Sequence, residues 1–267
     1  MKALSFREYT KRVGGDYVLT LCNVQAADGI RLYGTLHKAQ FSKKPIIVIA
    51  HGYFSSNRVG PHRLYYQIAS ALELKGYNVV RFDLRGIGES DGYIEDVKYL
   101  DHVADLTTVL FEFRQRFNDA SIILIAHCIG CNVSLPIIDD YQNYFRKVIF
   151  ISPYFTTPYT INAFFSQEQQ KELFSDGHTY RKGIYADLTF FSGINDFSEF
   201  CKITRKHKDI ISVISAANDQ FISSDDINKF YEETEQTPII ISKADHNYLE
   251  RDSREELILK ILEHIEE

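Results

Sequence analysis

The sequence is poor in the features that mark several large classes of protein. It has no tryptophan and only four cysteines in 267 residues, which excludes the disulfide framework of small secreted domains. No stretch approaches the roughly 20 consecutive apolar residues of a membrane helix, and the N-terminal residues lack the apolar centre of a signal peptide. The formal net charge of -6 argues against a nucleic-acid surface. We therefore expect a cytoplasmic protein with no membrane span and no nucleic-acid partner.

What the chain does contain is an alternation of short apolar runs with amphipathic stretches. The apolar runs predict strands at 17–24, 30–37, 46–50, 78–83, 121–126, 147–151, 210–216 and 238–241. The amphipathic stretches predict helices at 62–75, 101–116, 224–232 and 251–264. The first two strands flank Asp28-Gly29, a turn signal that predicts an antiparallel hairpin. The rest predicts an α/β fold, with a mostly parallel sheet of about eight strands flanked by helices.

One segment interrupts this alternation. From 153 to 208 aromatic residues are crowded, drawn from the 19 phenylalanines and 17 tyrosines of the chain, and no strand–helix alternation is visible. We interpret this segment as an inserted, mainly helical cap. The predicted organisation is therefore a core in two parts, 1–152 and 209–267, with a cap at 153–208. As a group, the aromatics suggest an apolar or aromatic binding pocket.

The stretch from Ser121 to Ser134 organises the chain. Its apolar run predicts a buried strand, and the following Ala126-His-Cys-Ile-Gly130 has the form of a nucleophile elbow, G-x-S-x-G. Alanine replaces the first glycine, and Cys128 replaces the serine. Such a turn lifts the central side chain out of the sheet and leaves it at a helix N-terminus. Backbone N–H groups and the helix dipole there favour an anion, so a thiolate or an adjacent oxyanion would be stabilised.

Two further strands end in residues that suit the same chemistry. Asn218-Asp219 follows the strand at 210–216, and Asp245-His246 follows the strand at 238–241. Nucleophilic acyl transfer needs a nucleophile, a base and a group that orients the base. In doubly wound sheets such groups lie just past the C-terminal ends of strands. The order nucleophile, acid, histidine is the order used by α/β-hydrolases.

At this point the chain resembles the α/β-hydrolase fold family over nearly its whole length. More narrowly, it is similar to capped serine hydrolases of the feruloyl/cinnamoyl-esterase and monoglyceride-lipase kind. The resemblance rests on the elbow, on Asn218-Asp219 and Asp245-His246, and on the segments 51–53 (His-Gly-Tyr) and 82–90 (Phe-Asp-Leu-Arg-Gly-Ile-Gly-Glu-Ser).

The resemblance implies a role for five residues. Cys128 would be the nucleophile, His246 the base and Asp219 the orienting acid, and the backbone N–H groups of Tyr53 and Ile129 would form the oxyanion hole. It implies neither a cofactor nor a metal.

Cysteine at the elbow is the serious departure from the serine esterases. A thiolate forms a thioester intermediate, which amines and thiols attack more readily than an ester. We therefore expect cysteine-dependent acyl chemistry: a thioesterase, acyltransferase or esterase acting on an ester, thioester or lactone. The substrate would be a small acyl compound, either free or bound to CoA or a carrier protein.

Other interpretations of the same residues stay open. Cys128 could be a small hydrophobe in an inactive protein that binds a hydrophobic small molecule. Cys128 and Cys131 form a C-x-x-C at a helix start, which allows a redox role or a silencing disulfide. Asp245 could compete with Asp219 as the acid. Among the other histidines, His51 is expected to fix the oxyanion loop and His127 to pack, and a surface position is expected for His62, His102, His178 and His207.

Overall fold

The structure is a computed structural model that describes residues 18–39, 42–53, 56–156 and 158–266. In this part of the chain, strands form one sheet of eight and one hairpin of two. Across the large sheet their order is β1 (Val18–Gln25), β2 (Arg31–Lys38), β4 (Val79–Phe82), β3 (Ile46–Ala50), β5 (Ile122–His127), β6 (Phe145–Ile151), β9 (Ile211–Ala216) and β10 (Ile239–Ile241). The predicted opening hairpin is present, although Tyr17, where the first strand was expected to begin, lies outside the described residues.

The sheet is antiparallel at one side only. β1 pairs with β2 and β2 with β4 in antiparallel register, while every neighbouring pair from β4 to β10 is parallel. β3 and β5 are buried along their whole length, as their continuous β-branched runs predict for central strands covered on both faces. Parallel pairing brings the C-terminal ends of these strands to one edge, where the candidate residues lie.

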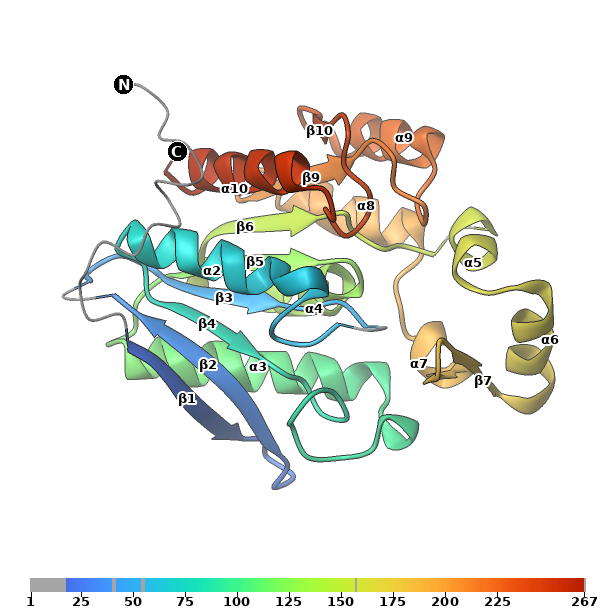
Figure 1. Ribbon diagram of the computed structural model, residues 1–267, viewed down its shortest axis with the longest axis horizontal. Coiled ribbons are helices and arrows are strands. Elements are labelled where there is room, and N and C mark those ends of the chain that lie inside the picture. The colour runs from blue at the N-terminus through green and yellow to red at the C-terminus, as the bar shows by residue number, and fades with distance from the viewer. Residues whose placement is uncertain (1–17, 40–41, 54–55, 157, 267) are drawn as a thin grey trace.

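Helices cover both faces of the sheet. They are α2 (Leu64–Leu74), α3 (Tyr99–Arg116), α4 (Ile129–Tyr141), α8 (Phe197–Lys206), α9 (Ser224–Thr234) and α10 (Arg251–Glu266). Short 3-10 turns occupy Pro61–Arg63, Ile94–Asp96 and Gln142–Tyr144. Buried side chains of α2 and α10 share one hydrophobic cluster, whereas those of α3, α4, α8 and α9 share another on the opposite face (Figure 1). The predicted α/β fold class is confirmed.

Between β6 and β9 the chain forms a group of short elements. They are α5 (Pro158–Phe164), α6 (Gln167–Asp176), β7 (His178–Arg181), β8 (Ile184–Asp187) and α7 (Leu188–Ser192), followed by α8. Figure 1 shows α5, α6, β7 and α7 beyond the C-terminal ends of the central strands. The segment is mainly helical, as predicted, but the antiparallel hairpin β7–β8 was not foreseen, since each strand is only four residues long.

α4 runs straight through a proline. Pro136 has no N–H to give to the carbonyl of Asn132, four residues earlier. The hydroxyl of Tyr99 on α3 donates to that carbonyl instead, at 2.9 Å. Because a buried acceptor without a partner is costly, this bond explains how the helix behind the elbow tolerates Pro136.

Candidate active site

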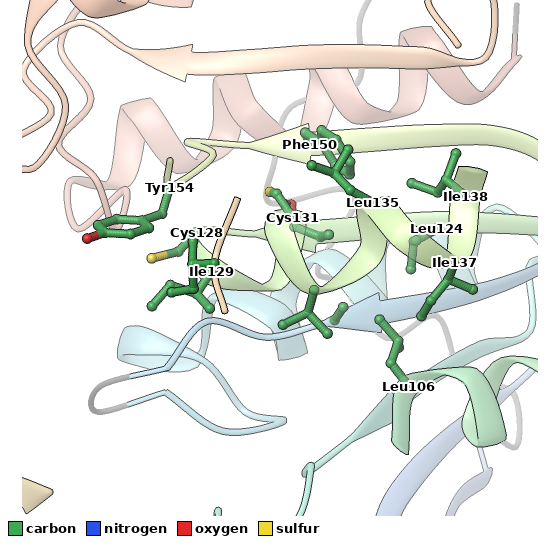
Figure 2. Close-up of a cluster of buried hydrophobic side chains, with 14 of the residues drawn as sticks. Leu106, Leu124, Cys128, Ile129, Cys131, Leu135, Ile137, Ile138, Phe150 and Tyr154 are labelled. Carbon is green, nitrogen blue, oxygen red and sulfur yellow. Dashed lines mark hydrogen bonds between the residues drawn. The ribbon is translucent and has the colours of Figure 1, made fainter. Parts of the chain in front are cut away.

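The elbow places Cys128 in a strained backbone conformation between β5 and α4. Its φ of 57° and ψ of -127° lie outside the regions that residues with a side chain normally occupy. The surroundings hold it there: the Cys128 N–H donates to the carbonyl of Ile151 at 3.1 Å, and the Tyr154 N–H donates to the Cys128 carbonyl at 3.2 Å. Figure 2 shows the Cys128 sulfur turned out of α4 towards the side of Tyr154.

The second glycine of the motif is required by close packing. A Cβ on Gly130 would lie 2.5 Å from the carbonyl oxygen of His51 and 2.9 Å from that of Ala50, which only glycine permits. Ala126, which replaces the first glycine, is fully buried and accommodated. The small residues of the elbow therefore let α4 approach the end of β3 closely.

The loop after β3 lies close to Cys128. A Cβ built on Gly52 would lie 3.7 Å from Cys128 Sγ, so the backbone of the predicted oxyanion loop reaches the sulfur. His51 holds this loop, because its Nε2 accepts a hydrogen bond from the Leu84 N–H at 3.1 Å and its Nδ1 lies 2.5 Å from the Gly52 carbonyl. The ring of Tyr53 packs on Phe190 of α7, with ring centres 4.5 Å apart. Ile129 begins α4, so its N–H has no carbonyl partner within that helix.

The predicted base and acid meet behind Cys128. His246 Nδ1 donates to Asp219 Oδ2 at 2.7 Å, and the backbone N–H groups of Phe221 and Ile222 donate to Asp219 Oδ1 at 2.8 and 3.2 Å. Both side chains are almost fully buried. Asp245 does not compete for this place, since its carboxylate accepts from the Leu249 N–H. The structure thus brings Cys128, His246 and Asp219 into one site.

Charge within this group favours a protonated His246. Burial alone would lower the pKa of His246, but the Asp219 carboxylate and the Cys128 side chain outweigh it and raise that pKa to about 10. Burial alone would raise the pKa of Asp219, but His246 and the two backbone N–H groups outweigh it and hold that pKa below its usual value. His246 Nε2 is buried and has no hydrogen-bond partner of ordinary geometry among the described residues, although the Cys128 side chain lies close enough to act on the pKa of His246 as a hydrogen-bond partner.

Cys131 is separate from this site. Its Sγ donates to the Ala126 carbonyl at 3.2 Å, its side chain is fully buried, and all four cysteines are free thiols. Figure 2 shows the sulfurs of Cys128 and Cys131 pointing in different directions. Among the described residues, no group of three or more His, Cys, Asp or Glu side chains could hold a metal ion. None of the helices described is long and apolar enough to cross a membrane.

His127 does more than pack. Its Nε2 donates to the His246 carbonyl at 2.9 Å, which fixes Nδ1 of the neutral ring as an acceptor for the Tyr65 hydroxyl at 2.7 Å. Burial lowers the pKa of His127 to about 3, in keeping with a neutral ring. The Tyr65 oxygen in turn accepts from the Gly52 N–H at 3.2 Å and lies 3.1 Å from Ser56 Oγ. A buried chain of hydrogen bonds thus joins Gly52, in the predicted oxyanion loop, to the backbone of His246.

Two other histidines correct the sequence-based expectation. His102 and His207 were expected at the surface, but only 2% and 4% of their area is exposed. His102 Nε2 bonds to the carbonyl of Arg85, and His207 Nε2 to the carboxylate of Asp139. Sequence alone could not place them, because both partners are distant in the chain and neither motif spacing nor charge pattern marks the pairs.

Removing the Tyr65 hydroxyl should break the hydrogen bonds that join Gly52 to the backbone of His246 and so displace both residues. We expect Tyr65→Phe to lower kcat by on the order of 10²-fold with little change in KM, since small displacements of reacting groups have effects of this size. It should also destabilise the fold by about 1–3 kcal/mol, because buried partners lose a hydrogen bond. Steady-state kinetics and urea unfolding measure the two effects.

The matched control is Tyr231→Phe. Tyr231 is equally buried, and its hydroxyl bonds to the Val213 carbonyl at 2.9 Å, away from Cys128 and His246. This variant should lose similar stability and keep its kcat. Equal kcat in Tyr65→Phe and the wild type would show that this chain of hydrogen bonds does not position the site.

An open cavity of about 100 Å³ lies over Cys128. Phe164 and Phe221 form its apolar part, and its polar lining includes Ser56, Gln220, Asn247, Arg181 and Lys182. A larger groove of about 390 Å³ adjoins it, shares Tyr53 and Ser56 with it, and is lined by Tyr180, Tyr185, Ile87 and Ile184 among others. Cys128 therefore lies at a small polar chamber with an adjoining tyrosine-lined groove.

Comparisons with known proteins agree with the fold. The family profile described as Serine aminopeptidase, S33 matches residues 42–182, more than half of the chain. A search of curated proteins gives no match. Among solved structures, Est1E from Butyrivibrio proteoclasticus with ferulic acid bound is similar at 17% identity and a TM-score of 0.73, over 92% of this chain and 100% of that one. The Pyrococcus furiosus esterase Pf2001 is similar at 17% identity and a TM-score of 0.69, over 100% and 94%.

The eight-stranded sheet, the strained elbow at the end of β5 and the family match all point the same way. The chain belongs to the serine aminopeptidase S33 family of α/β-hydrolase fold proteins.

Proposed function

We propose that the protein is a cysteine-dependent acyl-transfer enzyme, a thioesterase, acyltransferase or esterase, with Cys128, His246 and Asp219 as its triad. One observation carries the proposal: Cys128 stands at a strained elbow in the same pocket as His246, whose other ring nitrogen is bonded to buried Asp219. An inert turn would need neither the strain nor the buried charge pair. The family is described by its serine enzymes, whereas this chain carries cysteine at the elbow.

The chemistry follows from where the proton rests. The pKa of His246 is raised to about 10, which favours a proton on His246 at neutral pH. In the proposed mechanism this proton comes from the thiol of Cys128, and the resulting thiolate is the nucleophile. The thiolate adds to the acyl carbonyl, and the tetrahedral intermediate collapses as His246 gives its proton to the leaving group. A thioester on Cys128 remains. His246 then takes a proton from water or another acceptor, which attacks the thioester and regenerates the thiolate.

The oxyanion of both intermediates would lie between the N–H groups of Tyr53 and Ile129. The loop before Tyr53 reaches the sulfur, and Ile129 starts the helix behind it. Each such donor contributes about 3–4 kcal/mol to transition-state stabilisation. The packing of Tyr53 on Phe190 means that the segment 153–208, acting as a cap, would help to hold this loop.

The pocket supports an apolar or aromatic acyl group. Phe164 and Phe221 face each other with ring centres 4.4 Å apart above the site, and Phe221 meets the His246 ring edge-on at 4.8 Å. The similarity to Est1E, which was solved with ferulic acid, suggests a small aromatic acid or its ester. Attachment of the acyl group to CoA or a carrier protein fits a cysteine nucleophile, because thioester exchange then links two thiols of similar reactivity.

Matched acyl donors test the proposal. An oxygen ester and a thioester of the same hydroxycinnamic acid should both release a burst of leaving group equal to the enzyme concentration. The thioester should turn over faster, and added thiols or amines should raise the rate if the enzyme transfers the acyl group. A protein that only binds hydrophobic small molecules would bind both compounds and turn over neither.

A further inference from the structure

The positively charged side chain of Arg181 lines the cavity over Cys128, which we call the chamber, and is held in place there. It ends β7 just before the turn Lys182-Gly183, whose φ angles of 51° and 78° match a tight two-residue hairpin turn. Its Nε donates to the Phe164 carbonyl at 2.7 Å. Its guanidinium carbon lies 4.7 Å from the ring centre of Phe164 and 5.2 Å from that of Phe221. Hairpin, hydrogen bond and aromatic stacking together hold the side chain in place.

Apart from the sulfur of Cys128, the charged side chains known to line this chamber are cationic. Arg181 and Lys182 line it, and none of the described residues that line it is acidic. Asp219 lies behind His246, with 1% of its side chain exposed, and is already bonded to it. Burial lowers the pKa of Arg181, and the charge of Cys128 acts in the opposite direction, which places the guanidinium within electrostatic reach of the sulfur. A guanidinium nevertheless stays protonated in proteins.

We propose that Arg181 binds a carboxylate of the substrate, so that the preferred acyl donor is an ester or thioester with a carboxylate close to the scissile carbonyl. The planar fork of a guanidinium matches a carboxylate with two parallel hydrogen bonds. A carboxylate is short enough for the chamber of about 100 Å³, while the rings of Phe164 and Phe221 and the adjoining groove of about 390 Å³, with Tyr180 and Tyr185, contact the apolar part of the molecule. This inference rests on the proposed function of Cys128 and adds its substrate class.

Two alkylating reagents of nearly equal size test it without a known substrate. Iodoacetate and iodoacetamide both react with a thiolate by displacement of iodide, and only iodoacetate carries a carboxylate. We expect the rate ratio, iodoacetate over iodoacetamide, to be about tenfold or more higher at Cys128 than in the denatured protein, as a charged hydrogen-bonded pair implies. Arg181→Gln should abolish that preference and leave the iodoacetamide rate nearly unchanged. Arg181→Lys, which keeps the charge but not the fork, should be intermediate.

The matched control is Lys202→Gln, which removes one exposed positive charge from α8, away from the chamber. It should leave the ratio as in the wild type. If Arg181→Gln slows both reagents equally, Arg181 acts on the thiolate and the proposal is wrong. An unchanged ratio in Arg181→Gln would also overturn it, while leaving the nucleophilic role of Cys128 intact.

A binding measurement covers the case in which Cys128 is unreactive and the proposed function itself fails. Monomethyl succinate carries an ester and a carboxylate, and dimethyl succinate carries two esters. In calorimetric titrations of Cys128→Ala protein, the monomethyl compound should bind about tenfold or more tightly than the dimethyl compound, and Arg181→Gln should remove the difference. Equal affinities for the two compounds would refute carboxylate recognition whatever the reactivity of Cys128.

Discussion

Replacing Cys128 by alanine is expected to lower kcat by at least about 10⁴-fold, because loss of the nucleophile of a catalytic triad has effects of this size or larger. The change removes a single sulfur from a side chain that is 6% exposed, and alanine carries the same backbone strain as cysteine at a φ of 57°. The fold should therefore be kept, with a melting temperature close to that of the wild type. Steady-state turnover of the thioester and circular dichroism measure the two properties.

Two companion variants sharpen this prediction. Cys22→Ala removes a thiol on β1 outside the site and should leave kcat unchanged. Cys128→Ser keeps a nucleophile of the serine type. If Cys128→Ser gains plain esterase activity, the scaffold is a hydrolase that its cysteine restricts; if it loses all activity, the thiol itself is required. Turnover that survives in Cys128→Ala would contradict the assigned nucleophile.

The second large effect is expected at the acid. Asp219→Asn should lower kcat by about 10⁴-fold with the geometry intact, since an amide cannot stabilise the imidazolium and favours the wrong ring tautomer. The two carboxylate oxygens of Asp219 accept three hydrogen bonds in the wild type, and the single amide oxygen of asparagine can replace only one of those two acceptors. Asp245→Asn is the matched control, because Asp245 is adjacent to His246 in sequence but bonds to Leu249. Similar losses in the two variants would refute the assignment of Asp219.

The same pair gives a pH dependence of stability with a defined sign. Burial alone would lower the pKa of His246, but Asp219 and Cys128 have the larger effect and raise it from 6.5 to about 10. The stabilisation from the protonated ring is therefore complete below pH 6.5 and is lost as the pH rises towards 10. We expect the difference in the free energy of unfolding between the wild type and Asp219→Asn, measured in urea, to decrease over this pH interval. If this difference stays constant from pH 6 to about 10, Asp219 does not stabilise a protonated His246.

The parts of the site that follow strands could be predicted from the sequence. Cys128, Asp219 and His246 each come just after an apolar run, and parallel strands deliver their C-terminal ends to one edge. Gly130 was recognisable as part of the elbow motif, and the structure adds that it lets α4 approach β3, where a Cβ would meet the His51 carbonyl. Local chemistry and sheet topology were sufficient for these residues.

The parts that depend on contacts between distant segments could not be predicted. Arg181 reaches the chamber through a hairpin of two four-residue strands inside an aromatic segment that shows no period of two. His127 looked like a packing residue because its partners, Tyr65 and the His246 carbonyl, are 62 and 119 residues away. The donor that compensates for Pro136 inside α4, the Tyr99 hydroxyl, likewise belongs to another helix.

The most direct test of the central claim is the mass of the protein during turnover. Wild-type protein mixed with a hydroxycinnamoyl thioester and quenched in acid at early times should carry one acyl group, located by proteolysis on the peptide that contains Cys128. Cys128→Ala protein treated in the same way should carry none. An adduct that persists in Cys128→Ala, or steady turnover by the wild type with no adduct at any time, would contradict the account.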